Sequence, residues 1–176
     1  MRDYFDVLGV QRKFHFSDGE LEAKFLELSK KLHPDRFARA AAHERVAALA
    51  KSTELNDAYK VLKDRVKRAE YLLKLEGLDV ADEKSQSVKA DPALLAEMME
   101  RNEALHDARA AGDDAAMGVL KVRTAAERAE ALEAVDAAFD RYDAGDRSVL
   151  PQIAQSLVAL RYHARFLDQL EGKDEL

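Results

Sequence analysis

The stretch Leu32-His33-Pro34-Asp35-Arg36-Phe37 lies between two segments whose apolar residues recur at helical spacing. Pro34 disfavours the α conformation at His33 and has no backbone N–H for a continuing helix, so the preceding helix is predicted to end here. The stretch is therefore expected at an exposed polar corner. Two interpretations fit it alone: a helix-ending turn with Asp35 as a cap, which gives His33 no role, or a functional loop that uses all three residues.

The segment before this corner is predicted to be an amphipathic helix. Ser17-Asp18-Gly19-Glu20 has the sequence of a capping box, with Ser17 as the N-cap. The apolar residues that follow share one face, which we assign to a core: Leu21, Phe25, Leu28 and Leu32. Lys24 and Lys31 lie together on one flank of that face. They either form ordinary i,i+4 pairs with glutamates, each worth about 0.2–0.5 kcal/mol, or provide a basic docking surface.

The segment after the corner is predicted to be a longer helix that begins near His43. Its apolar residues keep helical spacing: Val46, Leu49, Leu55, Ala58, Tyr59 and Leu62. This helix can lie antiparallel to the first, with the corner as their connection. Shorter helices are predicted at residues 3–8, ended by Gly9, and at residues 65–76, ended by Gly77.

The composition favours an all-α protein. Of the 176 residues 47% are apolar, only seven are Gly and three are Pro, and there is no Cys. The absence of Cys excludes disulfides and cysteine-based zinc sites. Residues 1–76 carry 16 Lys and Arg against 13 Asp and Glu, a net of +3, whereas residues 77–176 carry 12 against 21, a net of -9. The two parts are therefore expected to meet different partners, and neither is basic enough to predict nucleic-acid binding.

The sequence shows no targeting or membrane-spanning signal at its N-terminus or in its apolar runs. The N-terminal residues contain no apolar signal core, and no run approaches the ~20 apolar residues of a membrane span. We expect a cytoplasmic protein with no membrane partner. Lys173-Asp174-Glu175-Leu176 spells an endoplasmic-reticulum retention address. We interpret it as a chance match, because the chain shows no means of entering the secretory pathway.

Three blocks of residues together resemble the J-domain of DnaJ-type co-chaperones. They are Tyr4-Phe5-Asp6-Val7-Leu8-Gly9-Val10, the central His33-Pro34-Asp35, and Leu55-Asn56-Asp57-Ala58-Tyr59-Lys60-Val61-Leu62. The resemblance implies that a set of loop and flanking residues docks a heat-shock ATPase chaperone and stimulates its ATP hydrolysis. That set is His33, Pro34, Asp35, Lys24, Lys31, Lys30 and Arg36.

Two further blocks resemble a narrower family, the HscB-type co-chaperones of iron-sulfur cluster biogenesis. Asp35-Arg36-Phe37 replaces the Lys-Asn-Pro continuation usual in J-domains, and Arg68-Ala69-Glu70-Tyr71-Leu72-Leu73 precedes Gly77. The chain length agrees with that type, as does the lack of a Gly/Phe-rich or zinc-binding region.

The second half is predicted to begin with a polar linker at residues 78–90, followed by a helical bundle. Asp91-Pro92 supplies an N-cap and a proline at the first helical position. Leu95 and Met99 project away from the core stripe of that helix, beside Glu103. They either widen the core stripe, with solvated carboxylates around them, or form an apolar strip that selects a basic partner.

The HscB resemblance implies that this helix binds the scaffold protein on which the cluster is assembled. The residues that match that surface are Leu95, Met99, Glu100, Glu103 and Asp107, whereas Ala96 is smaller than expected. An aromatic residue of the last helix joins the surface in that family, and Phe166 matches its position. From periodicity alone, Phe166 fits a core position equally well.

No catalytic or metal-binding constellation is evident. The remaining histidines, His15, His43, His106 and His163, lack metal-ligand spacing, and we expect them at the surface or as caps. No nucleophile has a base in a recognisable arrangement, and there is no phosphate-binding glycine loop. An enzyme is not expected, and neither is a cofactor.

The sequence as a whole predicts an all-α monomer. A J-domain, built as an antiparallel helical hairpin with short flanking helices, occupies residues 1–77, a linker residues 78–90, and a C-terminal three-helix bundle residues 91–176. The expected function is a co-chaperone that stimulates a specialised heat-shock ATPase and delivers the iron-sulfur cluster scaffold to it. The alternatives are a general J-domain co-chaperone with another client and a purely structural helical-bundle protein.

Overall fold

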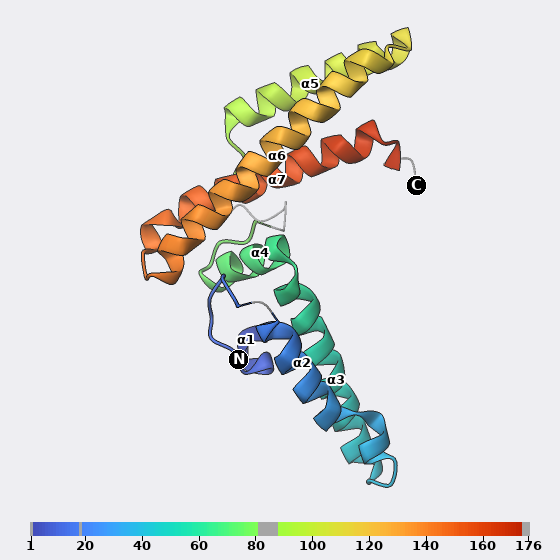
Figure 1. Cartoon of the computed structure of the whole chain (residues 1–176), viewed down its shortest axis with the longest axis vertical. Coiled ribbons are helices and arrows are strands. Elements are labelled where there is room, and N and C mark those ends of the chain that lie inside the picture. Colours follow the sequence, from blue (N-terminus) through green and yellow to red (C-terminus); the bar gives the residue numbers. More distant parts are fainter. Residues whose placement is uncertain (1, 18, 81–87, 174–176) are drawn as a thin grey trace. The chain divides into compact units, whose positions relative to one another are not determined.

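The computed structural model describes residues 2–17, 19–80 and 88–173 (Figure 1). The chain divides into two compact units, Met1–Leu72 and Leu73–Leu176, and all regular elements of the described part are helices. The prediction of an all-α fold is confirmed. The division falls inside helix α4 (Arg65–Leu75), so this helix contributes residues to both units. The predicted boundaries after residues 77 and 90 stay predictions.

The first unit opens with the short helix α1 (Tyr4–Leu8). Its N-terminus has a complete capping box, in which Asp3 accepts from the Asp6 backbone N–H at 2.9 Å and Asp6 accepts from the Asp3 N–H at 3.1 Å. Gly9 ends the helix in the left-handed conformation, with φ of 65°. This predicted helix and its glycine cap are both present.

Helix α2 (Glu20–Leu32) begins later than the sequence predicted. The Glu20 carboxylate reaches back to Ser17 as expected, accepting from its N–H at 3.3 Å and its hydroxyl at 2.9 Å. The N-cap is nevertheless Gly19, whose φ of 76° is left-handed, so helical geometry starts only at Glu20. Ser17 is therefore not the N-cap. Asp18 lies outside the described residues.

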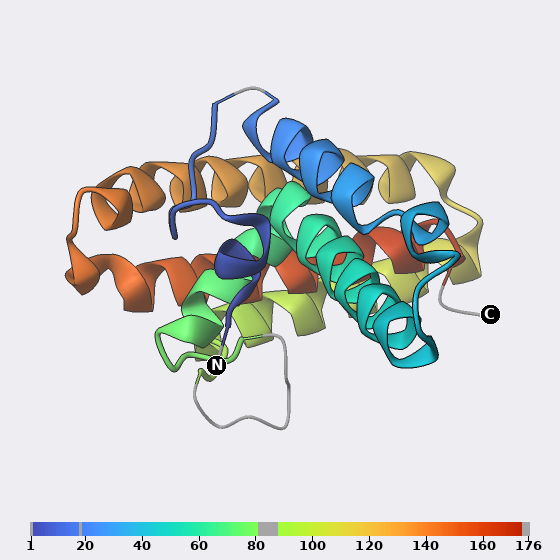
Figure 2. The same cartoon turned by 90° about the horizontal axis from the view of Figure 1, so that it is seen from below.

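Helices α2 and α3 (Ala42–Lys63) form an antiparallel hairpin, with the single-turn helix η1 (Pro34–Phe37) at their connection. Figure 2 shows the two helices side by side. The rings of Phe25 and Tyr59 stack across the pair with centroids 4.1 Å apart. The unit's buried apolar residues are Phe5, Val7, Leu8, Phe14, Leu21, Ala48, Leu55, Ala58, Leu62, Ala69 and Leu72. This core holds the hairpin so that the connection lies at its exposed end.

The second unit contains the predicted three-helix bundle, α5 (Pro92–Ala111), α6 (Asp114–Asp143) and α7 (Leu150–Leu170), with the short helix η2 (Arg147–Val149) before α7. Asp91 caps α5 by accepting from the Ala93 N–H at 2.8 Å, as predicted. Helix α6 has 30 residues, whereas α5 has 20 and α7 has 21. Helix α6 packs against both α5 and α7 and is the common support of the two.

Tyr142 and Arg147 hold the segment after α4 within the second unit. The Tyr142 hydroxyl donates to the Glu76 carboxylate at 2.7 Å, and Arg147 Nε lies 3.3 Å from the same carboxylate. The Arg147 guanidinium also stacks 3.9 Å from the centroid of the Tyr142 ring. Glu76 is thus bound at the end of the bundle where α6 passes into η2.

The described ends of the predicted linker contact α7. Val80 is buried and its carbonyl accepts from Arg161, while the Lys89 carbonyl accepts from the Gln155 side chain at 2.9 Å. Polar composition did not indicate these contacts, because one buried valine gives no periodic signal. Residues 81–87 of the predicted linker lie outside the described residues, as do residues 174–176 of the predicted chance tetrapeptide.

Candidate functional site

The His33-Pro34-Asp35 stretch lies at the tip of the α2–α3 hairpin. His33 ends α2 and is also the N-cap of η1, where its Nδ1 accepts from the Asp35 backbone N–H at 3.3 Å. Pro34 provides the first residue of η1, as its fixed φ favours. The side chains of His33 and Asp35 are 60% and 90% exposed. The corner is a capped turn as one interpretation had it, but the predicted cap is wrong, because His33 and not Asp35 is the N-cap. The functional interpretation of the corner stays a prediction, and His33 and Asp35 are exposed enough to contact a partner.

The two loop side chains also lie close to each other. His33 Nδ1 is 3.5 Å from the Asp35 carboxylate, a contact that becomes an ion pair only when the imidazole is protonated. When Nδ1 accepts from the backbone N–H of Asp35, the ring proton lies on Nε2. His33 then presents an N–H donor to solvent.

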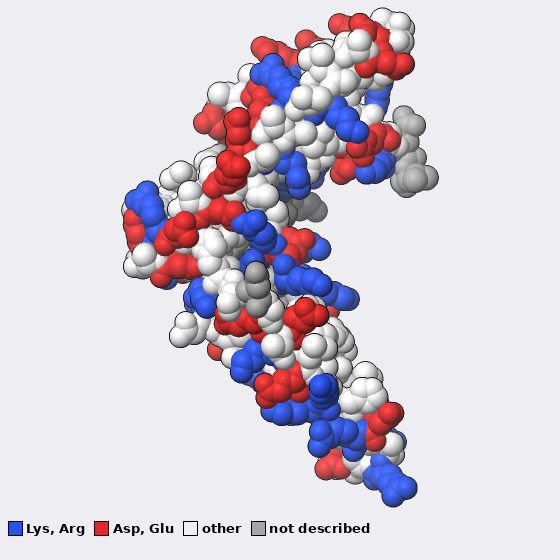
Figure 3. Space-filling model, in the orientation of Figure 1, with Lys and Arg blue, Asp and Glu red and all other residues white. Residues whose placement is uncertain are grey.

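Four exposed cations, Lys24, Lys30, Lys31 and Arg36, form what we call the basic flank. Figure 3 shows Lys and Arg along the α2–α3 hairpin, interleaved with Asp and Glu. Glu27 is the carboxylate within the flank: it lies 2.7 Å from Lys31 Nζ and 4.0 Å from Lys24 Nζ. The hydrogen bond and charge of Lys31 hold the Glu27 pKa below its ordinary value. The predicted flank is thus present and partly neutralised.

A groove between α5 and α7 is the main apolar concavity near the predicted scaffold-binding residues. It encloses about 390 Å³ and is lined by Leu95, Met98, Met99, Asn102, Tyr162, Arg165, Phe166 and Gln169. Leu95 and Met99 are 39% and 67% exposed, whereas Phe166 is only 2% exposed. Phe166 therefore forms the buried floor of this α5–α7 groove, and the two α5 side chains form its exposed lip.

The predicted carboxylates lie beyond the groove. Glu100, Glu103 and Asp107 are all exposed, and none of them lines it. Helical projection places Glu103 next to Met99, with Glu100 and Asp107 further round the outer face. The charge of Glu100 also acts on Arg123 of α6, where it helps to raise the Arg123 pKa, after the larger effect of Glu127. The carboxylates form an acidic border on one side of the lip.

Several residues of the bundle were not anticipated. The α7 wall of the groove includes Tyr162, Arg165 and Gln169, which periodicity alone does not single out. The prediction that His163 is a surface or capping residue is wrong, because it is 6% exposed. Arg101 is buried as well, at 4% exposure. The signal available in the sequence was the position of Arg101 within the core stripe, between Met98 and Leu105.

The surroundings of His163 make it a poor base for proton uptake. Burial lowers its pKa, and the nearby charge of Arg101 lowers it further. Its Nδ1 atom has no hydrogen-bond partner among the described residues. His163 is thus a buried neutral group of the bundle core. It belongs neither to the residues predicted to dock the ATPase chaperone nor to those predicted to bind the scaffold protein.

Comparisons with known proteins agree with this architecture. A family model described as the DnaJ domain matches residues 3–71, and one described as the HSCB C-terminal oligomerisation domain matches residues 90–171. The co-chaperone protein HscB homolog of Vibrio vulnificus is 32% identical over 174 residues, 98% of this chain and 97% of that protein. The chain belongs to the HscB family of co-chaperones. The family inferred from the residue blocks is confirmed.

Other HscB proteins are similar to part of this chain or to nearly all of it. The HscB homolog of Aliivibrio salmonicida is 39% identical over 111 residues, which span 63% of this chain and 64% of that protein, slightly under two thirds. Among solved structures, HscB from Vibrio cholerae superposes with a TM-score of 0.73 at 30% identity, covering 99% of this chain and 98% of that one. Human HscB gives 0.76 at 28% identity, covering 99% and 83%.

The predicted monomeric state is not tested by the comparisons. The description of the C-terminal family model includes oligomerisation, whereas the sequence predicted a monomer, so the oligomeric state stays a prediction. No helix within the described part of this HscB-family chain has the length and apolar character needed to cross a membrane.

Proposed function

We propose that the chain stimulates ATP hydrolysis by an Hsp70-type chaperone and presents to it the scaffold protein of iron-sulfur cluster assembly. The observation that carries the proposal is the exposure of His33 and Asp35 at the tip of a rigidly packed hairpin. Exposed polar side chains on a fixed support are suited to contacting a partner.

The loop needs no reacting group of its own. A partner's ATPase is accelerated when the loop binds the hydrolysis-competent state of the partner more tightly than its other states. His33 offers an N–H donor and Asp35 a carboxylate acceptor, and the η1 turn fixes the spacing between them. The basic flank adds attraction to an acidic surface and increases the association rate.

The α5–α7 groove is the proposed scaffold-binding surface. Met99 and Leu95 supply exposed, adaptable apolar area, and Phe166 supplies a fixed aromatic floor. Glu103, Glu100 and Asp107 border the lip and favour a basic partner. Because both binding sites belong to one chain, the scaffold is held at a raised effective concentration near the ATPase.

The loop is tested by single-turnover ATP hydrolysis of the Hsp70-type chaperone. His33→Gln and Asp35→Asn should each abolish stimulation, with the helical content by circular dichroism unchanged, because both side chains are exposed and support no core. His43→Gln, an exposed histidine of α3 outside the loop, is the matched control and should stimulate normally. Full stimulation by both loop variants would refute the docking role.

The groove is tested by binding of the purified scaffold protein without its cluster. The double variant Leu95→Ala/Met99→Ala should weaken binding at least about tenfold, since exposed apolar anchors carry much of an interface's affinity. Val119→Ala/Val122→Ala removes another exposed apolar pair, from α6, and should bind like the unmodified chain. If the chain stimulates the ATPase but does not bind the scaffold at micromolar concentration, its client is a different protein.

A further inference from the structure

A charged residue occupies the centre of the core stripe of α5. The residues of α5 that are buried are Met98, Arg101, Leu105 and Ala108. They recur at spacings of three, four and three, so the guanidinium of Arg101 points into the bundle together with apolar side chains. Burying a charge costs folding free energy unless the charge is paired and hydrogen-bonded. The positions of its partners therefore restrict the position of the guanidinium.

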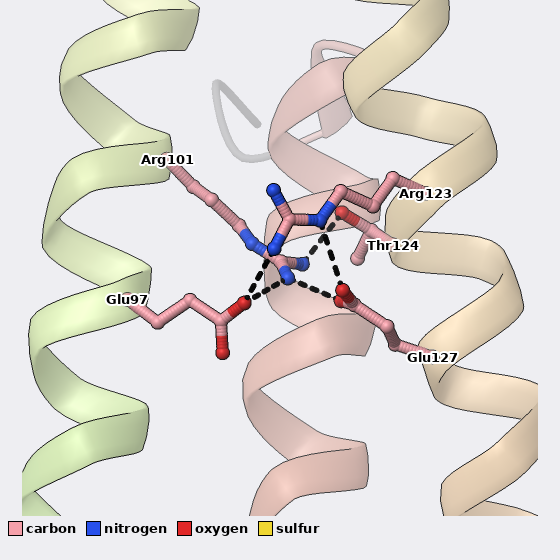
Figure 4. Close-up of polar contacts among 5 residues, drawn as sticks. All are labelled: Glu97, Arg101, Arg123, Thr124 and Glu127. Carbon is pink, nitrogen blue, oxygen red and sulfur yellow. Dashed lines mark hydrogen bonds and ion pairs between the residues drawn. The ribbon is translucent and has the colours of Figure 1, made fainter.

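Five side chains of α5 and α6 form a closed polar junction around Arg101 (Figure 4). Arg101 donates to Glu97 at 2.5 Å, to the Thr124 hydroxyl at 3.0 Å and to Glu127. Arg123 closes the ring by donating to Glu127 and to Glu97, each at 3.0 Å. Two guanidinium groups and two carboxylates alternate, so the formal charges of the polar junction cancel.

The carboxylate of Glu127 is ionised in this setting. Its burial acts to raise its pKa, but hydrogen bonds from Arg101 and Arg123 outweigh that effect and hold the pKa below its ordinary value. The contact between Arg101 and Glu127 is therefore charge-assisted, and bonds of this kind depend strongly on geometry. Arg101 Nε has no hydrogen-bond partner among the described residues, so the two terminal nitrogens make all the hydrogen bonds that hold the guanidinium in the junction.

This arrangement fixes α5 in one position against α6. A slip of one residue moves a helix by about 1.5 Å along its axis and turns each side chain by about 100°. Either change would separate Arg101 from Thr124 and Glu127 and leave a buried charge unpaired. The apolar residues Met98, Leu105 and Ala108 also pack in the bundle, but apolar packing tolerates small shifts better than a charge-assisted hydrogen bond does, because it is not directional. The polar junction is thus a directional determinant of the register of α5.

The register of α5 in turn sets the shape of the α5–α7 groove. Leu95 and Met99 lie on the same helix as Arg101, whereas the Phe166 floor lies on α7. We propose that Arg101 is a positioning residue for partner binding: through the polar junction it fixes how Leu95 and Met99 stand relative to Phe166. The affinity part of this proposal rests on the proposed scaffold-binding function, and the positional part does not.

The test replaces the polar junction by apolar side chains. The variant Arg101→Leu/Thr124→Val/Glu127→Leu leaves no unpaired buried charge, and replacements of this kind are often neutral or stabilising. Its urea midpoint should match or exceed that of the unmodified chain. Arg128→Leu, which removes an exposed arginine of α6, is the control. Should the triple variant not fold, Thr124→Val, which removes one hydrogen bond of the polar junction, is used with the same readouts.

The first readout is the methyl NMR spectrum of the free protein. In the triple variant the Met99 and Leu95 methyl signals should shift and broaden or split, because α5 samples more than one register. The control should keep single signals at the unmodified positions. Unchanged, sharp Met99 and Leu95 signals in the variant would overturn the positioning role, whatever the protein binds.

The second readout is the dissociation constant for the cluster-free scaffold protein. The triple variant should have a dissociation constant about tenfold higher than that of the unmodified chain. When the three changes are added to a chain that already carries Met99→Ala, the dissociation constant should rise only slightly further, because Arg101 acts through the groove. A purely structural role would predict an unchanged affinity in a variant of full stability, and that result would also overturn the proposal. If the unmodified chain does not bind the scaffold, the proposed function fails, and the methyl spectra still decide the role of Arg101.

Discussion

The ammonium group of Lys31 lies 2.7 Å from the carboxylate of Glu27, within the surface proposed to attract the ATPase partner. The pair sits one helical turn before the His33 loop, and Glu27 also lies 4.0 Å from Lys24. Such exposed pairs contribute only about 0.3–0.5 kcal/mol to helix stability. The main effect of Glu27 is therefore on the electrostatic potential of the basic flank rather than on the fold.

Removing this carboxylate should accelerate docking. We expect Glu27→Gln to raise the association rate with the Hsp70-type chaperone by about threefold at low salt, and to lose this advantage at high salt, where the charges are screened. Stopped-flow binding at two salt concentrations measures both effects. Glu22→Gln, on the other flank of α2, is the matched control. An unchanged rate for Glu27→Gln would mean that the flank does not steer association.

The two faces of α5 should respond differently to truncation. Leu105→Ala removes a side chain that is 4% exposed and should cost about 3 kcal/mol of unfolding free energy, because it leaves a cavity in the bundle. Met99→Ala removes one that is 67% exposed and should cost less than about 0.5 kcal/mol. Urea unfolding measures both. Equal costs would contradict the assignment of Met99 to a free lip.

The stability of the bundle should depend on pH through His163. The charged groups that act on it are Arg101 and Glu97 of α5 and Glu127 and Arg128 of α6. Since burial and Arg101 lower its pKa in the folded state, the unfolded chain binds the proton more readily, with a pKa of about 6.5. The stability contributed by neutral His163 is complete above about pH 6.5 and is lost as the pH falls through the lowered folded pKa.

This pH effect can be isolated by substitution. Urea unfolding at about pH 7.5 and about pH 5.5 should show a smaller pH-dependent loss of stability for His163→Gln than for the unmodified chain. His106→Gln, an exposed histidine of α5, should behave like the unmodified chain. The role of His163 is refuted if its replacement leaves the pH dependence unaltered.

The N-cap of α5 should influence the groove from one turn away. Asp91→Ala removes the acceptor that holds the Ala93 N–H at 2.8 Å and should cost about 1 kcal/mol of unfolding free energy. The first turn of α5 would then fray, and Leu95 amide protection from hydrogen exchange should fall. Asp91→Asn retains a capping oxygen and should restore most of the protection. Equal protection in both variants would exclude a contribution of this cap.

Local sequence signals predicted much of the fold because they act over one or two turns. Asp91 and Pro92 start α5, and Gly9 ends α1 in the left-handed conformation. The start of α2 was misplaced because Ser17 and Glu20 satisfy the pattern of a capping box whether or not Gly19 interrupts the helix. That choice depends on the conformation of Gly19, which the pattern does not encode.

Tertiary contacts explain what the sequence did not predict about the sites. His33, Asp35, Leu95 and Met99 are exposed as their patterns indicated. The burial of Arg101 and His163 was not predicted. The position of Arg101 in the core stripe was a signal, but the partners that pair its charge come from another helix and meet it only after folding. Phe166 was assigned either to the core or to the binding surface; it is buried on the floor of the groove, and its part in binding stays a prediction.

The uneven burial of the three helices implies a hierarchy of local opening within the bundle. Helix α7 buries seven residues, all but His163 apolar, whereas α5 buries four, of which one is the charged Arg101. Because buried apolar area sets the free energy of local unfolding, the amide protons of α5 should exchange faster than those of α7. A ligand that seats on the lip of α5 would then slow exchange along the whole helix, so its binding would be measurable as protection far from the contact itself.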